Sequence, residues 1–498
     1  MTSVDIRHGD CLKVLREMPD NSVDSVVTDP PYGLSNTKPQ QVSDVLASWV
    51  AGDAEAVPAK RGGFMGKDWD SFVPPPAVWE ECLRVLKPGG HMAVFAGTRT
   101  QDLMGLSIRL AGFEIRDTLG WIYGSGFPKS MDVGKAIDRS NGENRNRQLE
   151  FTEWMRSTGI TAREINEATE TNMGSHYLTD KSQPAIATAD LFDKLRPLLP
   201  EVPERIERLV AERTGIEWTD YVKREVVGVR TTGIGTGKGG TAFIGDSDNR
   251  DITAPATPEA ERWDGWGTAL KPAIEPIILA RKPLVGTVAQ NVLEHGVGGL
   301  NIDACRVGSG GHLAWSAPRN MGYHGGSDAE GSVATEAPAG RFPANVLLDE
   351  HAATEMDKQS GHLQTGGPKS GGATEGITGW RSGNFDRLDA VGGASRFFPV
   401  FKYQAKAPKK ERPVIEREDG SKIQHPTVKP VALMEWLVEL ITPPGGVVLD
   451  PFAGSGTTLQ AAINKGFIPI GIEQDADYIR LIETRLENAE ETLFTTTN

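Results

Sequence analysis

The stretch "VVLDPFAGSGTT" at 447–458 constrains the fold of this chain more than any other feature. An apolar run typical of a strand ends at Asp450, Gly454 and Gly456 follow, and a helix-forming segment begins at Thr457. Glycine lets a backbone approach a ligand closely, and a helix N-terminus presents free N–H groups to an anion. The stretch therefore predicts the strand–loop–helix unit of a nucleotide-type cofactor site.

The residues around this loop narrow the kind of site. It is not a P-loop, because no lysine precedes Thr457, and Leu459 stands where GxGxxG requires its third glycine. The next apolar run, "FIPIGIE", ends at Glu473. An acidic residue at the end of the second strand is placed to bind the hydroxyls of a ribose. The alternative is a solvated charge at a strand end.

A second acidic strand end occurs in "TDPPYGL" at 28–34. Asp29 follows a β-rich run, and Pro30 and Pro31 fix the backbone while removing two N–H donors. A rigid turn of this kind directs one carboxylate and nearby carbonyls into a fixed space, and Tyr32 adds a flat ring. Two acceptors beside a stacking face suit a planar amino-heterocycle such as adenine or cytosine. The alternative is an ordinary turn whose tyrosine serves packing.

Both ends of the chain alternate strands with helices. Residues 77–90 predict a helix stopped by "PGG", and the apolar run at 91–97 predicts a buried strand. Near the other end, "KPVALMEWLVELI" predicts an amphipathic helix and "DADYIRLIETRLENAEE" a last one. Such alternation predicts an α/β fold with a mostly parallel sheet covered on both faces.

The composition excludes several classes of protein. A net charge of −14 argues against a nucleic-acid coat, although 396–430 carries nine basic against four acidic residues and could form a local basic groove. No apolar run is long enough for a transmembrane helix, and the N-terminal residues do not resemble a secretory signal. The three cysteines form no CxxC pair, so we expect a cytoplasmic protein without a metal site.

The motifs together resemble a known family. "DPPY", "HPTVKP" at 425–430 and "DPFAGSGTT" are similar to motifs of the S-adenosylmethionine-dependent amino-methyltransferases of DNA, and their order resembles the permuted β group found in phages and prophages. The resemblance implies a Rossmann-like class I methyltransferase fold that is circularly permuted. Its sheet would be built as strands three to seven and then one and two, so that "DPPY" and "DPFAGSG" meet at adjacent strands.

The resemblance also implies a division of the chain. Residues 1–140 would form the catalytic half of the methyltransferase domain and 421–498 the cofactor-binding half. A helical insertion at 141–225 and a target-recognition region at 226–420, with a strand near 274–281, would lie between them. The segment "WGTALKPAIEPIILARKPL" at 266–284 is similar to one in phage-borne members.

The resemblance assigns roles to individual residues. Asp29 and the Pro30 carbonyl would accept hydrogen bonds from the target amine, with Pro31 completing the turn, Tyr32 stacking on the base, and Trp121 or Tyr123 on its other face. The residues expected to bind S-adenosylmethionine are Asp10, Thr427, Lys429, Asp450, Phe452, Gly454, Gly456, Thr457 and Glu473. No metal and no covalent enzyme intermediate are expected.

The expected reaction is methylation of adenine N6 in double-stranded DNA after base flipping. The alternatives are methylation of cytosine N4 and a catalytically silent DNA-binding regulator. A homodimer and a cognate nuclease are left open.

The middle of the chain allows fewer expectations. Residues 160–185 resemble a helix-turn-helix with a turn at Gly174, and the alternative is a helical spacer. The glycine-rich stretches 306–340 and 361–394 predict long loops, and "GTGKGG" at 235–240 predicts a flexible connection.

Overall fold

The structure of the chain is a computed structural model. It describes residues 4–34, 37–58, 70–124, 126, 130–141, 143–180, 183–213, 226–231, 249–255, 258–308, 313–314, 335–336, 340–365, 390–401, 412–417 and 420–495. "GTGKGG" and most of the two glycine-rich stretches lie outside these residues. Within the described residues, no helix is both long and apolar enough to span a membrane.

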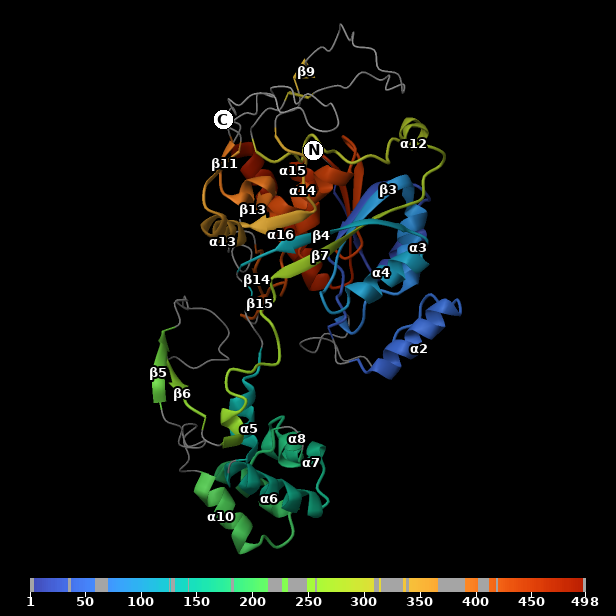
Figure 1. Cartoon of the computed structure of the whole chain (residues 1–498). Helices are drawn as coiled ribbons and strands as arrows, with labels where there is room; N and C mark the ends of the chain where they lie inside the picture. The colour runs from blue at the N-terminus through green and yellow to red at the C-terminus, as the bar shows by residue number, and fades with distance from the viewer. Residues whose placement is uncertain are drawn as a thin grey trace. The chain divides into compact units, whose positions relative to one another are not determined.

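Nine strands of the described residues form one sheet (Figure 1). Their order across the sheet is β1 (Asp5–His8), β17 (Ile468–Glu473), β16 (Val447–Asp450), β2 (Val23–Thr28), β3 (Leu86–Phe95), β7 (Ile274–Arg281), β4 (Glu114–Ile122), β10 (Val346–Asp349) and β13 (Val400–Phe401). All neighbours are parallel except β7, which runs antiparallel to β3 and β4. The predicted α/β fold with a mostly parallel sheet is confirmed.

The strand order shows the circular permutation directly. The last two strands of the chain, β16 and β17, lie between the first two, β1 and β2. Val448 pairs with Ser25 and Leu449 with Val26, so the "DPPY" and "DPFAGSG" motifs leave the carboxyl ends of neighbouring parallel strands. The predicted meeting of the two motifs is confirmed.

The two faces of the sheet bury different helices. Val26, Met92 and Val94 pack on one face with α1 (Cys11–Glu17), α3 (Pro76–Val85) and α4 (Gln101–Leu110). Val27 and Phe95, their neighbours in sequence, pack on the other face with α14 (Val431–Ile441) and α15 (Thr457–Asn464). Alternate residues of one strand point to opposite faces, and in Figure 1 α3 and α4 flank β3 on the side away from α14. The sheet is therefore covered on both faces, as predicted.

Residues 127–272 form a separate compact unit. Its helices are α5 (Val133–Asn141), α6 (Glu143–Ser157), α7 (Ala162–Thr169), α8 (Gly174–Tyr177), α9 (Ala189–Leu195), α10 (Glu204–Arg213) and α11 (Pro258–Glu261). Phe151, Tyr177 and Phe192 are buried at the centre of one apolar cluster, and α7 begins with a capping box at Thr161 and Glu164. The short helices pack around this cluster. However, α8, which follows the expected turn and would be the second helix of the helix-turn-helix, has only four residues and buries Tyr177.

The unit is inserted at a hairpin. The inserted residues follow β4 and precede β7. At this junction Ile122 pairs with Ile274, and the Tyr123 N–H donates to the Ala273 carbonyl at 3.0 Å, a normal hydrogen-bond length. The chain division inferred from the sequence therefore differs from the structure. The compact unit begins at 127 rather than 141, and β7, β10 and β13, which fall in the expected target-recognition region, belong to the central sheet. These strands pair with partners more than a hundred residues away in the chain, and a local sequence pattern does not indicate such pairing.

Candidate active site

The "DPPY" turn is held by its own side chains. The Tyr32 hydroxyl donates to Asp29 Oδ1 at 2.7 Å, and the Thr100 hydroxyl donates to the Tyr32 carbonyl at 2.6 Å. The Gly33 N–H donates to Asp70 Oδ1 at 3.0 Å. Pro30 is buried and Pro31 half-buried directly after β2. These contacts fix the Asp29 carboxylate at the carboxyl edge of the sheet.

Lys429 of "HPTVKP" joins this turn. Its ammonium lies 3.2 Å from Asp29 Oδ2 and 2.8 Å from Glu275 Oε2, and it donates to the Tyr32 hydroxyl at 3.0 Å. The same ammonium lies 4.8 Å from the centre of the Phe95 ring. The sequence placed Lys429 among the cofactor residues, whereas the structure joins it to the expected catalytic residues.

Burial and charge fix the protonation of this cluster. Burial opposes the ammonium of Lys429, but Asp29 and Glu275 together raise its pKa above the ordinary value. Burial, followed by the charges of Asp29 and Glu275, raises the pKa of Tyr32 well above its usual range. Lys429 is therefore a cation and Tyr32 a neutral donor at neutral pH.

The glycine loop closes on Glu473. Gly454 and Gly456 have φ of +53° and +77°, a left-handed conformation that favours glycine, and Gly456 caps α15 just before Thr457. The Gly454 N–H donates to Glu473 Oε2 at 2.8 Å, and the Asp475 N–H donates to Oε1 at 2.8 Å. Burial raises the pKa of Glu473. The loop and the acidic strand end thus form one unit, as their spacing suggested.

Asp450 ties the cofactor loop to the "DPPY" strand. Its buried carboxylate accepts from the Thr28 hydroxyl at 2.7 Å and from the Phe452 N–H at 3.1 Å. Burial raises its pKa to about 6, with the negative charge of Asp29 contributing in the same direction. Phe452 itself is half-buried, with its ring centre 6.3 Å from that of Trp79.

The remaining expected cofactor residues lie beside this loop or at its rim. His8 pairs with Glu473 across β1 and β17, so Asp10 follows the neighbouring strand end, where it is exposed and caps α1 through the Lys13 N–H at 3.1 Å. Thr427 is exposed, and its carbonyl accepts from His425 Nδ1. The His425 ring packs against Tyr478 with centroids 4.7 Å apart.

The two candidates for the second face of the base pocket differ in exposure. Trp121 is 2% exposed and belongs to the core, whereas Tyr123 is half-buried with its ring centre 5.5 Å from that of Trp121. Of the two rings, only Tyr123 retains accessible surface.

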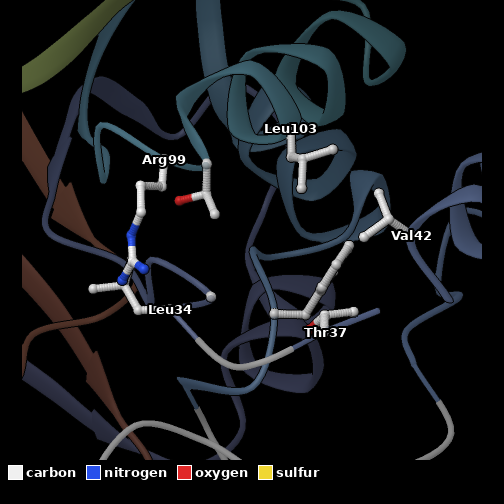
Figure 2. Close-up of a pocket in the computed structure, with 8 residues that line it drawn as sticks. Leu34, Thr37, Val42, Arg99 and Leu103 are labelled. Carbon is white, nitrogen blue, oxygen red and sulfur yellow. The ribbon is translucent and has the colours of Figure 1, made fainter. Parts of the chain in front are cut away.

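A cavity of about 200 Å³ lies next to the turn. Figure 2 shows Arg99 extending toward Leu34 on one side, with Val42 and Leu103 on the other. The residues lining it are Gly33, Leu34, Thr37, Val42, Phe72, Arg99, Thr100 and Leu103. Because Thr100 both lines this cavity and bonds the Tyr32 carbonyl, the cavity adjoins the candidate site.

Sequence reasoning missed three side chains of the site. Glu275 lies within the "WGTALKPAIEP" segment, which was noted as a motif but given no role. His425 belongs to "HPTVKP", and a Cβ on Gly454 would lie 3.0 Å from its Nε2. Thr28 immediately precedes Asp29. The motif around Glu275 was the one available signal for that residue.

Comparison with known proteins agrees with this geometry. The sequence model of a family described as DNA methylase matches residues 23–196 and 342–484, which is more than half of the chain. The chain belongs to the DNA methylase family.

Individual relatives match over short segments. A DNA adenine methyltransferase of Escherichia coli K12, YhdJ, is 48% identical over 65 residues, which are 13% of this chain and 22% of YhdJ. The type II methyltransferase M.ScaI of Streptomyces caespitosus is 38% identical over 79 residues, 16% of this chain and 26% of M.ScaI. The matches thus span about a quarter of each relative.

Solved structures of similar proteins include the PvuII DNA methyltransferase, described as cytosine-N4-specific. It is 12% identical with a TM-score of 0.36, and the comparison covers 97% of this chain and 87% of that chain.

Proposed function

We propose that the protein transfers a methyl group from S-adenosylmethionine to the exocyclic N6 of adenine in double-stranded DNA, with the target base flipped out of the helix. The observation that carries this proposal is the pairing of β2 with β16. It sets the Asp29 carboxylate beside the glycine loop, and the Thr28–Asp450 hydrogen bond of 2.7 Å links the two motifs.

The glycine loop and Glu473 suit the cofactor. Backbone N–H groups hold both oxygens of Glu473, and a carboxylate has about four acceptor positions, so the ribose hydroxyls could also donate to it. Phe452 is half-buried beside the loop, and Asp10 at the neighbouring strand end would contact the adenine of the cofactor. Gly454, Gly456 and Thr457 would give the cofactor close access to backbone. Asp450 and Thr427 would lie near its methionine part.

The turn suits the chemistry of an exocyclic amine. The nitrogen lone pair of such an amine is delocalised into the ring, so the amine is a poor nucleophile. Acceptors at Asp29 and the Pro30 carbonyl would favour a pyramidal nitrogen, and the lone pair could then displace the sulfonium methyl directly. Catalysis would consist of positioning and electrostatic stabilisation. Tyr32 would stack on the flipped base, with Tyr123 as the second ring.

Adenine is the favoured target for two reasons. "DPPY" with a leading aspartate is more typical of adenine enzymes, and the matched E. coli relative is named an adenine methyltransferase. The family includes cytosine-N4 enzymes, so the methylated base that forms must be identified to establish the target. Purified protein should be incubated with unmethylated genomic DNA and S-adenosylmethionine, followed by nucleoside mass spectrometry.

N6-methyladenine in that assay supports the proposal. N4-methylcytosine as the product would show that the target base is cytosine and not adenine, and the assignment of the site residues would stand. Absence of any methylated base across varied genomic DNA, from a protein that binds S-adenosylmethionine in calorimetry, would favour the DNA-binding regulator.

A further inference from the structure

We infer that Glu275 and Lys429 are positioning residues that hold one net negative charge around Asp29 for methyl transfer. The inference rests on the proposed function. It reassigns Lys429 from the cofactor to the target amine and gives the "WGTALKPAIEP" segment a role.

The geometry shows that both oxygens of Asp29 are engaged. Oδ1 accepts from the Tyr32 hydroxyl at 2.7 Å, and Oδ2 faces the Lys429 ammonium at 3.2 Å. An amine that enters the site therefore competes with Lys429 for Oδ2. The Lys429 ammonium is also 2.8 Å from Glu275 Oε2. It can therefore keep this ion pair when the amine displaces it from Asp29.

Counting charges shows why the second carboxylate matters. Asp29 and Lys429 alone form a neutral pair, which stabilises a nitrogen that gains positive character less than a cluster with a net negative charge does. Glu275 adds one negative charge, so the three groups together carry a charge of −1. The side chain of Lys429 is 9% exposed, and those of Asp29 and Glu275 are 21% and 24% exposed, so solvent screens this charge only in part.

The position of Glu275 in the fold supports a role at the site. It stands at the start of β7, opposite Trp121 of β4, where the chain returns from the inserted unit. Lys429 lies 154 residues further along, directly before α14. Two remote segments thus converge on one carboxylate, and the Tyr32 hydroxyl lies within 3.4 Å of Glu275 Oε2.

Other charged groups also face the cluster. Asp70 and Asp450 interact unfavourably with the charge of Asp29, and His425 interacts with both Asp29 and Lys429. Burial lowers the pKa of His425, so this ring is neutral at neutral pH. None of these groups is substituted in the variants below. Loss of the Lys429 charge also removes its lowering effect on the pKa of His425, so the comparison of Lys429→Met with the double variant, which both lack this lysine, reports the charge of the cluster itself.

The test is the pH dependence of the single-turnover methylation rate, measured with S-adenosylmethionine and unmethylated genomic DNA. Lys429→Met leaves two adjacent anions, so the acid limb of the profile should move to higher pH by about 1–3 units. Glu275→Gln leaves a neutral cluster, so the acid limb should move to lower pH and the plateau rate should fall by at least about tenfold. The double variant restores a charge of −1, and its acid limb should return toward that of the wild type.

Two controls separate charge from structure. Lys465, which caps the C-terminus of α15, forms an ion pair at 2.6 Å with Glu439 of α14, so Lys465→Met and Glu439→Gln repeat the same chemistry at a second ion pair. Lys429→Arg keeps the charge and should keep the acid limb in place. Calorimetry should show S-adenosylmethionine affinity within about threefold of wild type for all variants.

The outcomes are distinct. The inference is established if the acid limbs of Lys429→Met and Glu275→Gln move in opposite directions and the acid limb of the double variant returns toward that of the wild type. Unmoved limbs with additive losses, or Lys429→Met losing cofactor affinity instead of rate, overturn it while the wild type remains an active methyltransferase. A wild type that transfers no methyl group overturns the proposed function and the inference with it.

Discussion

The carboxylate of Asp29 has two roles in the proposed reaction: it accepts a hydrogen bond from the target amine, and it supplies a negative charge. Asp29→Asn keeps one acceptor and loses the charge, and a charge-assisted hydrogen bond contributes about 1.5–3 kcal/mol. Methyl transfer should therefore slow by about ten- to hundredfold at least, and Asp29→Ala should lose more because the amine is also misoriented. Single-turnover methylation measures the loss, and unchanged S-adenosylmethionine affinity serves as the control. Wild-type turnover by Asp29→Ala would remove the catalytic assignment.

Gly454 combines a backbone and a packing requirement. Its φ of +53° disfavours a side chain, and a Cβ there would lie 3.0 Å from His425 Nε2. Gly454→Val should abolish S-adenosylmethionine binding in calorimetry while the far-UV circular dichroism stays that of the wild type. Gly466→Val is a suitable control, because Gly466 has a similar φ of +77° with open space around it. Equal affinity of Gly454→Val and the wild type would contradict the assigned cofactor loop.

Asp450 makes stability depend on pH in an unusual direction. Its pKa is raised from 3.8 to about 6, so the folded state disfavours the ionised form. The fold should lose stability from this group as pH rises from about 4 to about 6, since ionisation is easier in the unfolded chain. Asp450→Asn should remove that loss, so its advantage over the wild type in free energy of unfolding should grow across this interval. A constant difference between the two proteins would contradict the raised pKa.

Among the elements, the junction of β3 with α12 (Val288–His295) depends on one buried amide. Asn291 is 0% exposed, accepts from the Val285 N–H at 2.9 Å, and donates to the carbonyls of Pro88 and Val297, each at 2.8 Å. Asn291→Ala should lower the free energy of unfolding by about 1–3 kcal/mol, because buried polar groups lose their partners. Urea denaturation measures this, with the exposed Glu294→Ala as the control. Equal losses in both variants would show that the amide is not structural.

Prediction from sequence succeeded where the signal was local. The strand ends at Asp29 and Asp450 are each followed by a turn or loop with proline and glycine, and the apolar run before Glu473 ends at that acidic residue, so their positions could be predicted one by one. The Glu275–Lys429 contact could not be predicted, because it joins segments 154 residues apart and depends on how β7 enters the sheet. The boundary of the inserted unit was missed for the same reason. Its limits follow from the pairing of Ile122 with Ile274 and not from any change in composition.

At the scale of the whole molecule, the inserted unit should be separable from the sheet. Tyr123 and Ala273 are hydrogen-bonded at 3.0 Å, so a short glycine-containing turn could replace residues 127–272. We expect the shortened chain to bind S-adenosylmethionine as the wild type does and to bind DNA more weakly, if the unit contacts DNA. DNA affinity should be measured across a range of salt concentrations, because a smaller dependence on salt indicates fewer phosphate contacts. An unchanged affinity and salt dependence would make the unit a spacer.

The place of β16 and β17 between β1 and β2 also bears on how the protein is made. A ribosome releases β1 and β2 first, yet the two strands that join them emerge more than 400 residues later. Until then the hydrogen-bonding edges of β1 and β2 have no neighbour on that side, and unpaired edges of this kind promote association between chains. Biogenesis should therefore depend on chaperones that shield nascent chains throughout translation. A stop codon between residues 420 and 446 would remove both β16 and β17 and leave the middle of the sheet unfilled, so a nonsense mutation there should be as damaging as one much earlier in the chain.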